Sequence, residues 1–306
     1  MKRVIITGGT GFLGRALAQA LPENEYELIA LTRQPDKHKN LPNGMRAVQW
    51  DGRTAEGWGD LANGAYAIVN LAGESIGYPP LPWSAARKQK IRESRINAGQ
   101  AVLAAVRATT EKPRVVIQSS AVGYYGSHGD TVITEEVPVG NDFLAQVCKD
   151  WEASTAEIGS LGVRRVVIRT GLTLAKKEGV LPMFMLPFKF FVGGPLGSGK
   201  QYTPWIHVAD HVAAVRLLMD NVTLRGAFNL ATPNPVTNAE FNRTLGKVMG
   251  RPAWMPAPEI ALKLALGVMA DQLLLTSQRI APKRLQEAGF KFQFTDAETA
   301  LRDVLK

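Results

Sequence analysis

The sequence predicts an α/β fold in which a doubly wound parallel sheet is followed by a smaller, mostly helical C-terminal region. Through the first half of the 306 residues, short apolar runs alternate with amphipathic helical stretches. This alternation is typical of buried parallel strands covered by helices on both faces. After Gly171, prolines and glycines become dense and helical stretches take over. We therefore expect one region at residues 1–171 and a second at 172–306, interleaved because the chain returns to the sheet around 206–230.

The expected elements follow from these patterns in chain order. Apolar, β-branched runs predict strands at residues 4–6, 28–32, 47–50, 67–70, 115–119, 166–169 and 228–230. Periodic apolar spacing predicts helices at residues 85–108, 143–158, 208–219, 239–249, 260–269, 280–288 and 297–305. The crossovers between successive strands should be right-handed.

Composition and charge restrict the class of protein. The single cysteine, Cys148, cannot form an internal disulfide and favours a reducing compartment such as the cytoplasm. Neither a signal peptide nor an uninterrupted apolar span is recognisable. We expect a cytoplasmic monomer or homodimer with no membrane partner and no metal site.

The formal net charge of +9 at pH 7 raises the question of a polyanionic partner. Part of the excess lies between Arg87 and Arg95, where basic residues face only Glu93. No nucleic-acid motif and no interleaved aromatic residue accompanies them. A solvated helix face and a small phosphate-bearing ligand both explain this charge, so we expect a small-molecule substrate and no nucleic acid.

A glycine-rich turn links the first strand to a helix. Gly8, Gly11 and Gly14 follow the apolar run at residues 4–6, and an amphipathic stretch comes next. Such a strand, turn and helix N-terminus bind a pyrophosphate, because free N–H groups and the helix dipole face it while glycines allow close approach. This is the dinucleotide-binding turn of a Rossmann sheet. The cofactor contacts expected in this turn come from Gly8, Thr10, Gly11, Phe12 and Leu13.

The end of the second strand indicates which dinucleotide is bound. Thr32 and Arg33 lie about twenty residues beyond the turn, where an NAD site usually carries an acidic residue against the ribose 2′-hydroxyl. A guanidinium instead suits a 2′-phosphate, through charge-assisted hydrogen bonds. The sequence therefore favours NADP over NAD. A solvated arginine at a strand end is the alternative explanation.

Small and hydroxyl-bearing residues follow two later strands. Leu71, Ala72 and Gly73 end the fourth strand and would let the backbone pass close to a cofactor. Ser120 and Tyr124 follow the fifth strand and are candidates for proton transfer to a substrate carbonyl or alcohol. Packing at a strand–loop corner is an equally good explanation of Tyr124.

Together these segments resemble the extended short-chain dehydrogenase/reductases of the nucleotide-sugar epimerase type. More narrowly, the chain resembles an epimerase-family subgroup related to human short-chain dehydrogenase family 39U. The segments that carry the resemblance are the glycine turn, residues 70–74, Asn97, Gly123-Tyr124-Tyr125-Gly126, Arg169-Thr170-Gly171, residues 193–199, residues 205–210 and the tail from Ser277 to Phe290. The resemblance implies further cofactor contacts at Arg95, Arg169 and Thr170, with Gln201 and Tyr202 on the substrate side. It also implies an NADP(H)-dependent epimerase-like oxidoreductase acting on a small polar carbonyl or alcohol.

One departure from the family pattern concerns the chemistry. The family pairs a tyrosine acid/base with a lysine four residues on, and no tyrosine in this chain has Lys at that distance. Alignment on Glu152 puts Leu144 and Cys148 in the two positions. Ser120 and Tyr124 are the candidates to replace the pair. The alternative is a catalytically silent NADP(H)-binding sensor or scaffold.

Overall fold

Seven parallel strands form the central sheet of the computed structural model, which describes residues 1–77 and 79–306. Their order is β11-β7-β5-β4-β1-β2-β3, which confirms the predicted doubly wound parallel sheet. The strands are β1 (Lys2–Thr7), β2 (Tyr26–Thr32), β3 (Arg46–Gln49), β4 (Ala67–Asn70), β5 (Val115–Ala121), β7 (Arg164–Thr170) and β11 (Gly226–Leu230). The strand order reverses between β1 and β4, which is where open α/β sheets bind ligands at the carboxyl edge.

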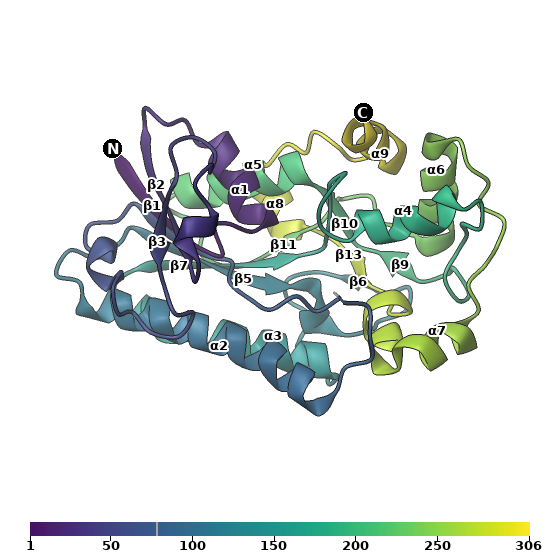
Figure 1. Ribbon diagram of the computed structural model, residues 1–306, viewed down its shortest axis with the longest axis horizontal. Helices are drawn as coiled ribbons and strands as arrows, with labels where there is room; N and C mark the ends of the chain where they lie inside the picture. The colour runs from purple at the N-terminus through teal and green to yellow at the C-terminus, as the bar shows by residue number, and fades with distance from the viewer. Residues whose placement is uncertain (78) are drawn as a thin grey trace.

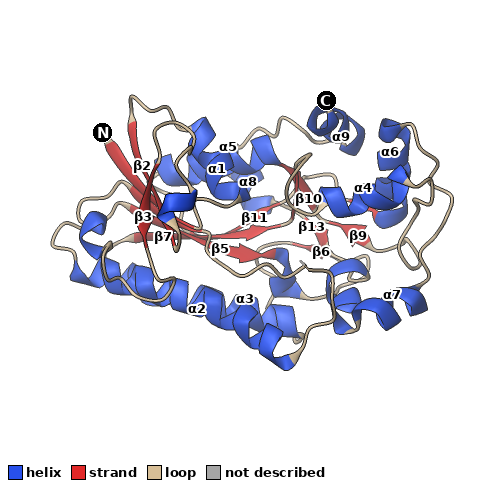
Figure 2. Ribbon diagram, in the orientation of Figure 1, coloured by secondary structure: helices blue, strands red, loops and turns tan. Residues whose placement is uncertain are grey.

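Helices cover both faces of this sheet (Figures 1 and 2). One face carries α2 (Ala85–Ala108) and α3 (Phe143–Ala153), and the other carries α1 (Phe12–Ala20), α5 (Val208–Asp220) and α8 (Lys283–Glu287). Separate apolar clusters fill the two sides, because alternate strand residues such as Val4 and Ile5 point to opposite faces. Short 3₁₀ segments occur at η1 (Pro35–Lys37), η2 (Gly59–Ala62), η3 (Val122–Tyr125) and η4 (Ala156–Leu161).

A smaller assembly lies beyond the carboxyl edge of the sheet, at the right of Figure 1. Its helices are α4 (Leu181–Lys189), α6 (Asn238–Met249), α7 (Glu259–Leu266) and α9 (Ala297–Leu305), with a π-helical turn η5 (Ala270–Leu274). Three two-stranded pairs complete it: β8 (Leu172–Leu174) with β10 (Trp205–His207), β9 (Tyr202–Thr203) with β12 (Val236–Thr237), and β6 (Val132–Ile133) with β13 (Arg279–Ile280). Phe188, Trp205 and Phe241 lie in its separate apolar core.

Several expected elements differ from the structure. The helix expected at 143–158 ends at Ala153, and the 3₁₀ segment η4 follows it. Helix α4 was not expected in the proline-rich stretch, yet Pro182 sits in its first turn, where a missing N–H costs nothing. The helix expected at 260–269 ends at Leu266, because Gly267 adopts φ +57° and the chain turns into η5. The helix expected at 280–288 starts late, at Lys283, since β13 pairs with β6 before Pro282.

The C-terminal segment is fixed to α5 by a buried carboxylate. Asp210 accepts hydrogen bonds from the backbone N–H groups of Gln293 and Phe294, at 2.7 and 2.9 Å. The ring of His207 stacks on that of Phe294, and its Nδ1 accepts from the N–H of Ala209 at the start of α5. His207 and Asp210 therefore hold the last helices in place.

The tight packing of the first turn gives a stability prediction. A Cβ on Gly14 would lie 2.6 Å from the Cα of Gly9, so Gly14→Ala should lower the free energy of unfolding by about 1–3 kcal/mol, as overpacking does. Gly159→Ala is the matched control, because no atom lies within 4 Å of its added Cβ. Chemical denaturation would measure both, and equal stabilities would contradict the packing argument.

Candidate active site

Two hollows lie at the carboxyl edge of the sheet. The first, which we call the cleft, has a volume of about 450 Å³ and lies over the ends of β1, β2 and β4. The second, which we call the cavity, has a volume of about 230 Å³ and lies between the ends of β5 and β7, helix α3 and the C-terminal assembly. Of the predicted cofactor residues, the cleft is lined by Gly8, Thr10, Thr32, Arg33, Ala72 and Gly73.

The glycine turn leaves the N-terminus of α1 open at the cleft. Gly8 has φ +66°, and a Cβ there would lie 3.2 Å from the backbone of Leu71 and Ala72, so the turn passes directly against the end of β4. Gly11 is the N-cap of α1, with no side-chain cap and no acidic residue in the first turn. Uncapped N–H groups and the positive end of the helix dipole suit an anion. Gly11, Phe12, Leu13 and Leu71 adjoin the cleft without lining it.

Basic side chains gather at the end of the cleft beside β2 and β3. Arg33, Arg53 and Lys90 line it, and among the described residues none of the three forms an ion pair. Arg87 also lines it but pairs with Glu74 at 3.0 Å. Arg53 was missed from the sequence. It lies four residues beyond the end of β3, and Asp51 positions it by accepting its N–H at 2.7 Å. The arrangement can hold a phosphate monoester.

Arg95 lies between the two hollows. Its Nη1 donates to the carbonyl oxygens of Glu74 and Ile91, at 3.0 and 2.8 Å, and its guanidinium lies 4.9 Å from the centre of the Trp151 ring. Burial lowers the pKa of this side chain. Arg95 lines the cavity rather than the cleft, but a Cβ on Gly73, which lines the cleft, would lie 3.1 Å from its Cζ.

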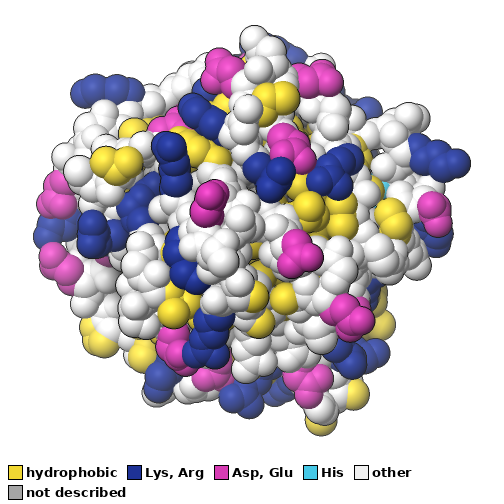
Figure 3. Space-filling model, turned by 90° about the vertical axis from the view of Figure 1, so that its left-hand side faces the viewer, with side chains coloured by type: hydrophobic (Ala, Val, Ile, Leu, Met, Phe, Trp, Pro, Cys, Tyr) yellow, Lys and Arg dark blue, Asp and Glu magenta, His cyan; other side chains and the backbone are white. Residues whose placement is uncertain are grey.

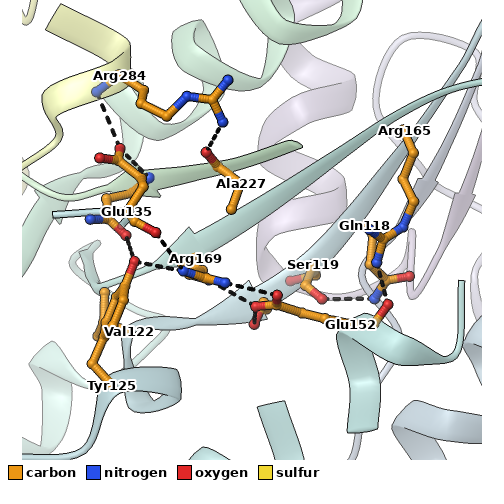
Figure 4. Close-up of polar contacts among 12 residues, drawn as sticks. Gln118, Ser119, Val122, Tyr125, Glu135, Glu152, Arg165, Arg169, Ala227 and Arg284 are labelled. Atoms are coloured by element: carbon orange, nitrogen blue, oxygen red, sulfur yellow. Dashed lines mark hydrogen bonds and ion pairs between the residues drawn. The ribbon is translucent and has the colours of Figure 1, made fainter. Parts of the chain in front are cut away.

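The side chain of Arg169 is buried and hydrogen-bonded within the protein interior (Figure 4). It is 5 % exposed, and it makes two hydrogen bonds to the carboxylate of Glu152, Nε to Oε1 at 2.9 Å and Nη2 to Oε2 at 3.0 Å. Its Nη1 donates to the hydroxyl of Tyr125 at 2.9 Å. The donors of its guanidinium therefore face Glu152 and Tyr125, and its contact with the cofactor stays a prediction. Thr170, the next residue, lines the cavity and not the cleft.

Ser120 and Tyr124 lie behind the cavity wall. The Ser120 hydroxyl is 2 % exposed and donates to Glu152 Oε1 at 2.7 Å. The ring of Tyr124 stacks on the Arg169 guanidinium, with 3.5 Å between the Cζ atom and the ring centre. Neither residue is among those that line the cavity. Ser120 thus contacts Glu152 and Tyr124 contacts Arg169, and the roles of both residues in proton transfer stay predictions.

The cavity wall carries other residues where the tyrosine and lysine pair would lie. Leu144 and Cys148 line it on α3, opposite Gly123. Burial raises the pKa of the Cys148 thiol to about 11, so the thiol is neutral at pH 7. Tyr202 also lines the cavity, and within the described part of the chain its hydroxyl has no hydrogen-bond partner.

Within residues 1–77 and 79–306, no three His, Cys, Asp or Glu side chains are grouped to hold a metal ion. No helix in the same ranges combines the length and apolarity needed to cross a bilayer. On the face drawn in Figure 3, basic side chains are interspersed with acidic ones rather than forming one continuous stripe.

Comparison with known proteins gives full-length relatives. A plant relative, the epimerase family protein SDR39U1 homolog, chloroplastic, of Arabidopsis thaliana, is 37 % identical over 99 % of this chain and 86 % of its own. Epimerase family protein YfhF of Bacillus subtilis is 37 % identical over 99 % and 97 %. Residues 4–146 match the NAD dependent epimerase/dehydratase family, and residues 257–304 match a domain of unknown function, DUF1731.

Solved structures agree with these relatives. The crystal structure of human epimerase family protein SDR39U1 (isoform 2) with NADPH has 30 % identity, a TM-score of 0.89 and coverage of 99 % of both chains. Thermus thermophilus UDP-glucose 4-epimerase in complex with NAD, at 18 % identity and a TM-score of 0.77, covers 99 % of this chain and 98 % of its own, and shares the fold.

The burial of Cys148 predicts slow alkylation. Because its pKa is raised to about 11, native protein at pH 8 should react with iodoacetamide at least ~100-fold more slowly than an ordinary thiol of pKa about 8.5. The rate should rise about tenfold with each pH unit and level off only above pH 11, because the thiolate is the reacting form. The chain unfolded in guanidinium chloride is the control, since Cys148 is its single cysteine. Equal rates for native and unfolded protein at pH 8 would contradict the assignment.

Proposed function

Because this chain belongs to the epimerase family that includes the SDR39U1 homologues, we propose that it is an NADP(H)-dependent, epimerase-like oxidoreductase for a small carbonyl or alcohol. The open N-terminus of α1 beside an unpaired basic cluster is the observation that carries this proposal. It supplies the two kinds of phosphate site that NADP requires. The structure of the human relative with NADPH supports the same cofactor.

The cleft fits this cofactor in two parts. Gly8 and Thr10, at the open end of α1, would hold the pyrophosphate, with Ala72 and Gly73 passing close beside it. Arg33 and Arg53, with Lys90 across the cleft, would bind the 2′-phosphate that distinguishes NADP from NAD. When bound, the nicotinamide ring supplies hydride transfer. The protein's own residues supply orientation and the proton.

We infer that the proton is handled at the cavity wall. Tyr202 lines the wall and its hydroxyl is free among the described residues, so it can donate to or accept from a substrate oxygen. Thr170 and Thr203 line the same cavity and can orient that oxygen. Ser120 and Tyr124 would act as positioning residues, because their contacts run to Glu152 and Arg169.

A catalytically silent NADP(H)-binding sensor or scaffold is the second candidate. The observation that favours it is the apolar character of the wall at Leu144 together with the neutral thiol of Cys148. Neither group can lower the pKa of a nearby phenol as a lysine does. Such a protein would bind NADPH as tightly as an enzyme and would not oxidise it.

Arg33 gives a test of cofactor choice. Arg33→Ala should weaken NADPH binding about tenfold, the equivalent of ~1.4 kcal/mol, and leave NADH binding nearly unchanged, since only NADPH carries the 2′-phosphate. Lys37→Ala is the matched control, because Lys37 is an exposed basic residue nearby that does not line the cleft. Isothermal titration calorimetry measures all four affinities. Equal losses in both variants would remove Arg33 from the phosphate site.

Turnover separates the two candidate functions. If the protein is an enzyme, it should oxidise NADPH in the presence of at least one member of a panel of small carbonyl compounds. The kcat of that reaction should fall at least ~100-fold in Tyr202→Phe, which is the usual effect of losing a general acid. Ser120→Ala and Tyr124→Phe should cost less than about tenfold, because neither side chain lines the cavity. NADPH binding without oxidation of any carbonyl would favour the silent protein instead.

A further inference from the structure

The cavity is lined by carboxamide side chains that are each fixed at one end. Gln201 donates its Nε2 to the carbonyl oxygens of Leu196 and Leu274, at 2.9 and 3.0 Å. Gln278 donates its Nε2 to the carbonyls of Val122 and Gly126, at 2.9 and 3.0 Å. These partners accept only, so the nitrogen of each amide must face them. The Oε1 atoms of the two glutamines therefore have no hydrogen-bond partner among the described residues.

Two further amides face the cavity in the opposite sense. Asn238 accepts the N–H of Leu196 on its Oδ1 at 2.8 Å, and Gln272 accepts the N–H of Leu144 on its Oε1 at 3.1 Å. Their nitrogens are therefore the free ends. Gln201, Asn238 and Gln278 are 7 %, 2 % and 4 % exposed, yet none of their unpaired atoms is sealed from solvent, so these atoms open into the cavity.

Charge is nearly absent from the same walls. Arg95 is the single charged residue among the described residues that line the cavity, and its guanidinium already donates to two backbone carbonyls. Two helices begin at the cavity, and the N-termini of both are closed. At α3, oxygen atoms of Asp142 and Gln272 accept the first N–H groups. At α6, the hydroxyl of Thr237 and the carbonyl oxygens of Gly199 and Gln201 accept them. An anion therefore has neither a free cation nor an open helix end here, in contrast to the cleft.

On these observations, and resting on the proposed function, we propose that the cavity takes a small uncharged substrate that carries at least two hydrogen-bond donors, such as a hydroxylated ketone or aldehyde. The oxygens of Gln201 and Gln278 accept from its hydroxyl groups, and the nitrogens of Asn238 and Gln272 donate to its oxygens. The cavity offers no partner to the diphosphate of a nucleoside diphosphate sugar, and its volume of about 230 Å³ is below the usual ~300–1,000 Å³ of sites for drug-sized ligands, so it suits a smaller and neutral molecule.

The C-terminal segment forms part of the cavity wall. Residues 257–304 match the domain of unknown function, and they supply Gln272 and Gln278 along with the apolar Leu273 and Leu274. The π-helical turn η5 presents the first of these amides to the N-terminus of α3. The segment closes the cavity and selects its occupant.

Binding to the NADPH-loaded chain tests the charge and size of the substrate. The probes are erythrulose and xylulose as neutral ligands, xylulose 5-phosphate as the charged match, and UDP-xylose as the nucleotide sugar. Calorimetry should give binding of at least one neutral ketose, and at least tenfold weaker binding of the phosphate and of UDP-xylose. Binding of neither ketose, or tighter binding of a phosphorylated probe, overturns the proposal.

A charge substitution tests the amides themselves. Gln272→Glu keeps the oxygen that accepts from Leu144 but replaces the free donor with an acceptor, so it should weaken ketose binding at least tenfold. Gln286→Glu, on the exposed surface of α8, is the control and should change nothing. NADPH affinity is measured in parallel. If the unmodified chain does not bind NADPH, the proposed function is contradicted. If NADPH binding is intact and Gln272→Glu binds the ketose as well as the unmodified chain does, only the role of the amides is contradicted.

Discussion

The ion pair between Arg169 on β7 and Glu152 on α3 is the constraint on which the arrangement of the site depends. A buried charge is costly unless it is paired and its remaining hydrogen-bonding positions are filled, and removal of one partner typically costs ~3–5 kcal/mol. Here Ser120 fills a position on the carboxylate, while Tyr125 accepts from the guanidinium and donates to Asn229 on β11 at 2.7 Å (Figure 4). One buried network thus ties β5, β7, β11 and α3 together.

This network also decides which face of α3 meets the cavity. Leu144, Cys148 and Glu152 are spaced four residues apart, so they lie on one stripe of the helix. With Glu152 held beneath the sheet edge, Leu144 and Cys148 must face the end of β5, where they line the cavity. Leu144 and Cys148, which the alignment on Glu152 assigns to the tyrosine and lysine positions of the family that the sequence resembles, thus both face the cavity.

Much of the fold could be predicted because local patterns determine it. Apolar β-branched runs located all seven strands of the sheet, and apolar periodicity located α2 at residues 85–108. Side-chain direction could not be predicted in this way. Arg169 lies near the end of β7, where the resemblance implies a cofactor contact, but a carboxylate seventeen residues earlier in the chain holds its guanidinium. Arg53 was missed for a related reason, since only the fold brings it to the same cleft as Arg33.

Arg95 joins the two hollows through a single guanidinium group. One side of it packs beneath Gly73 at the cleft, and the other forms part of the cavity wall against Trp151. Any ligand that displaces this group changes both surfaces at once. Thermodynamic linkage then requires reciprocity: if a ligand in the cleft changes the affinity of the cavity for its ligand by some factor, the ligand in the cavity changes the affinity of the cleft by the same factor. The two hollows share this wall residue, so their occupants can be energetically coupled through it.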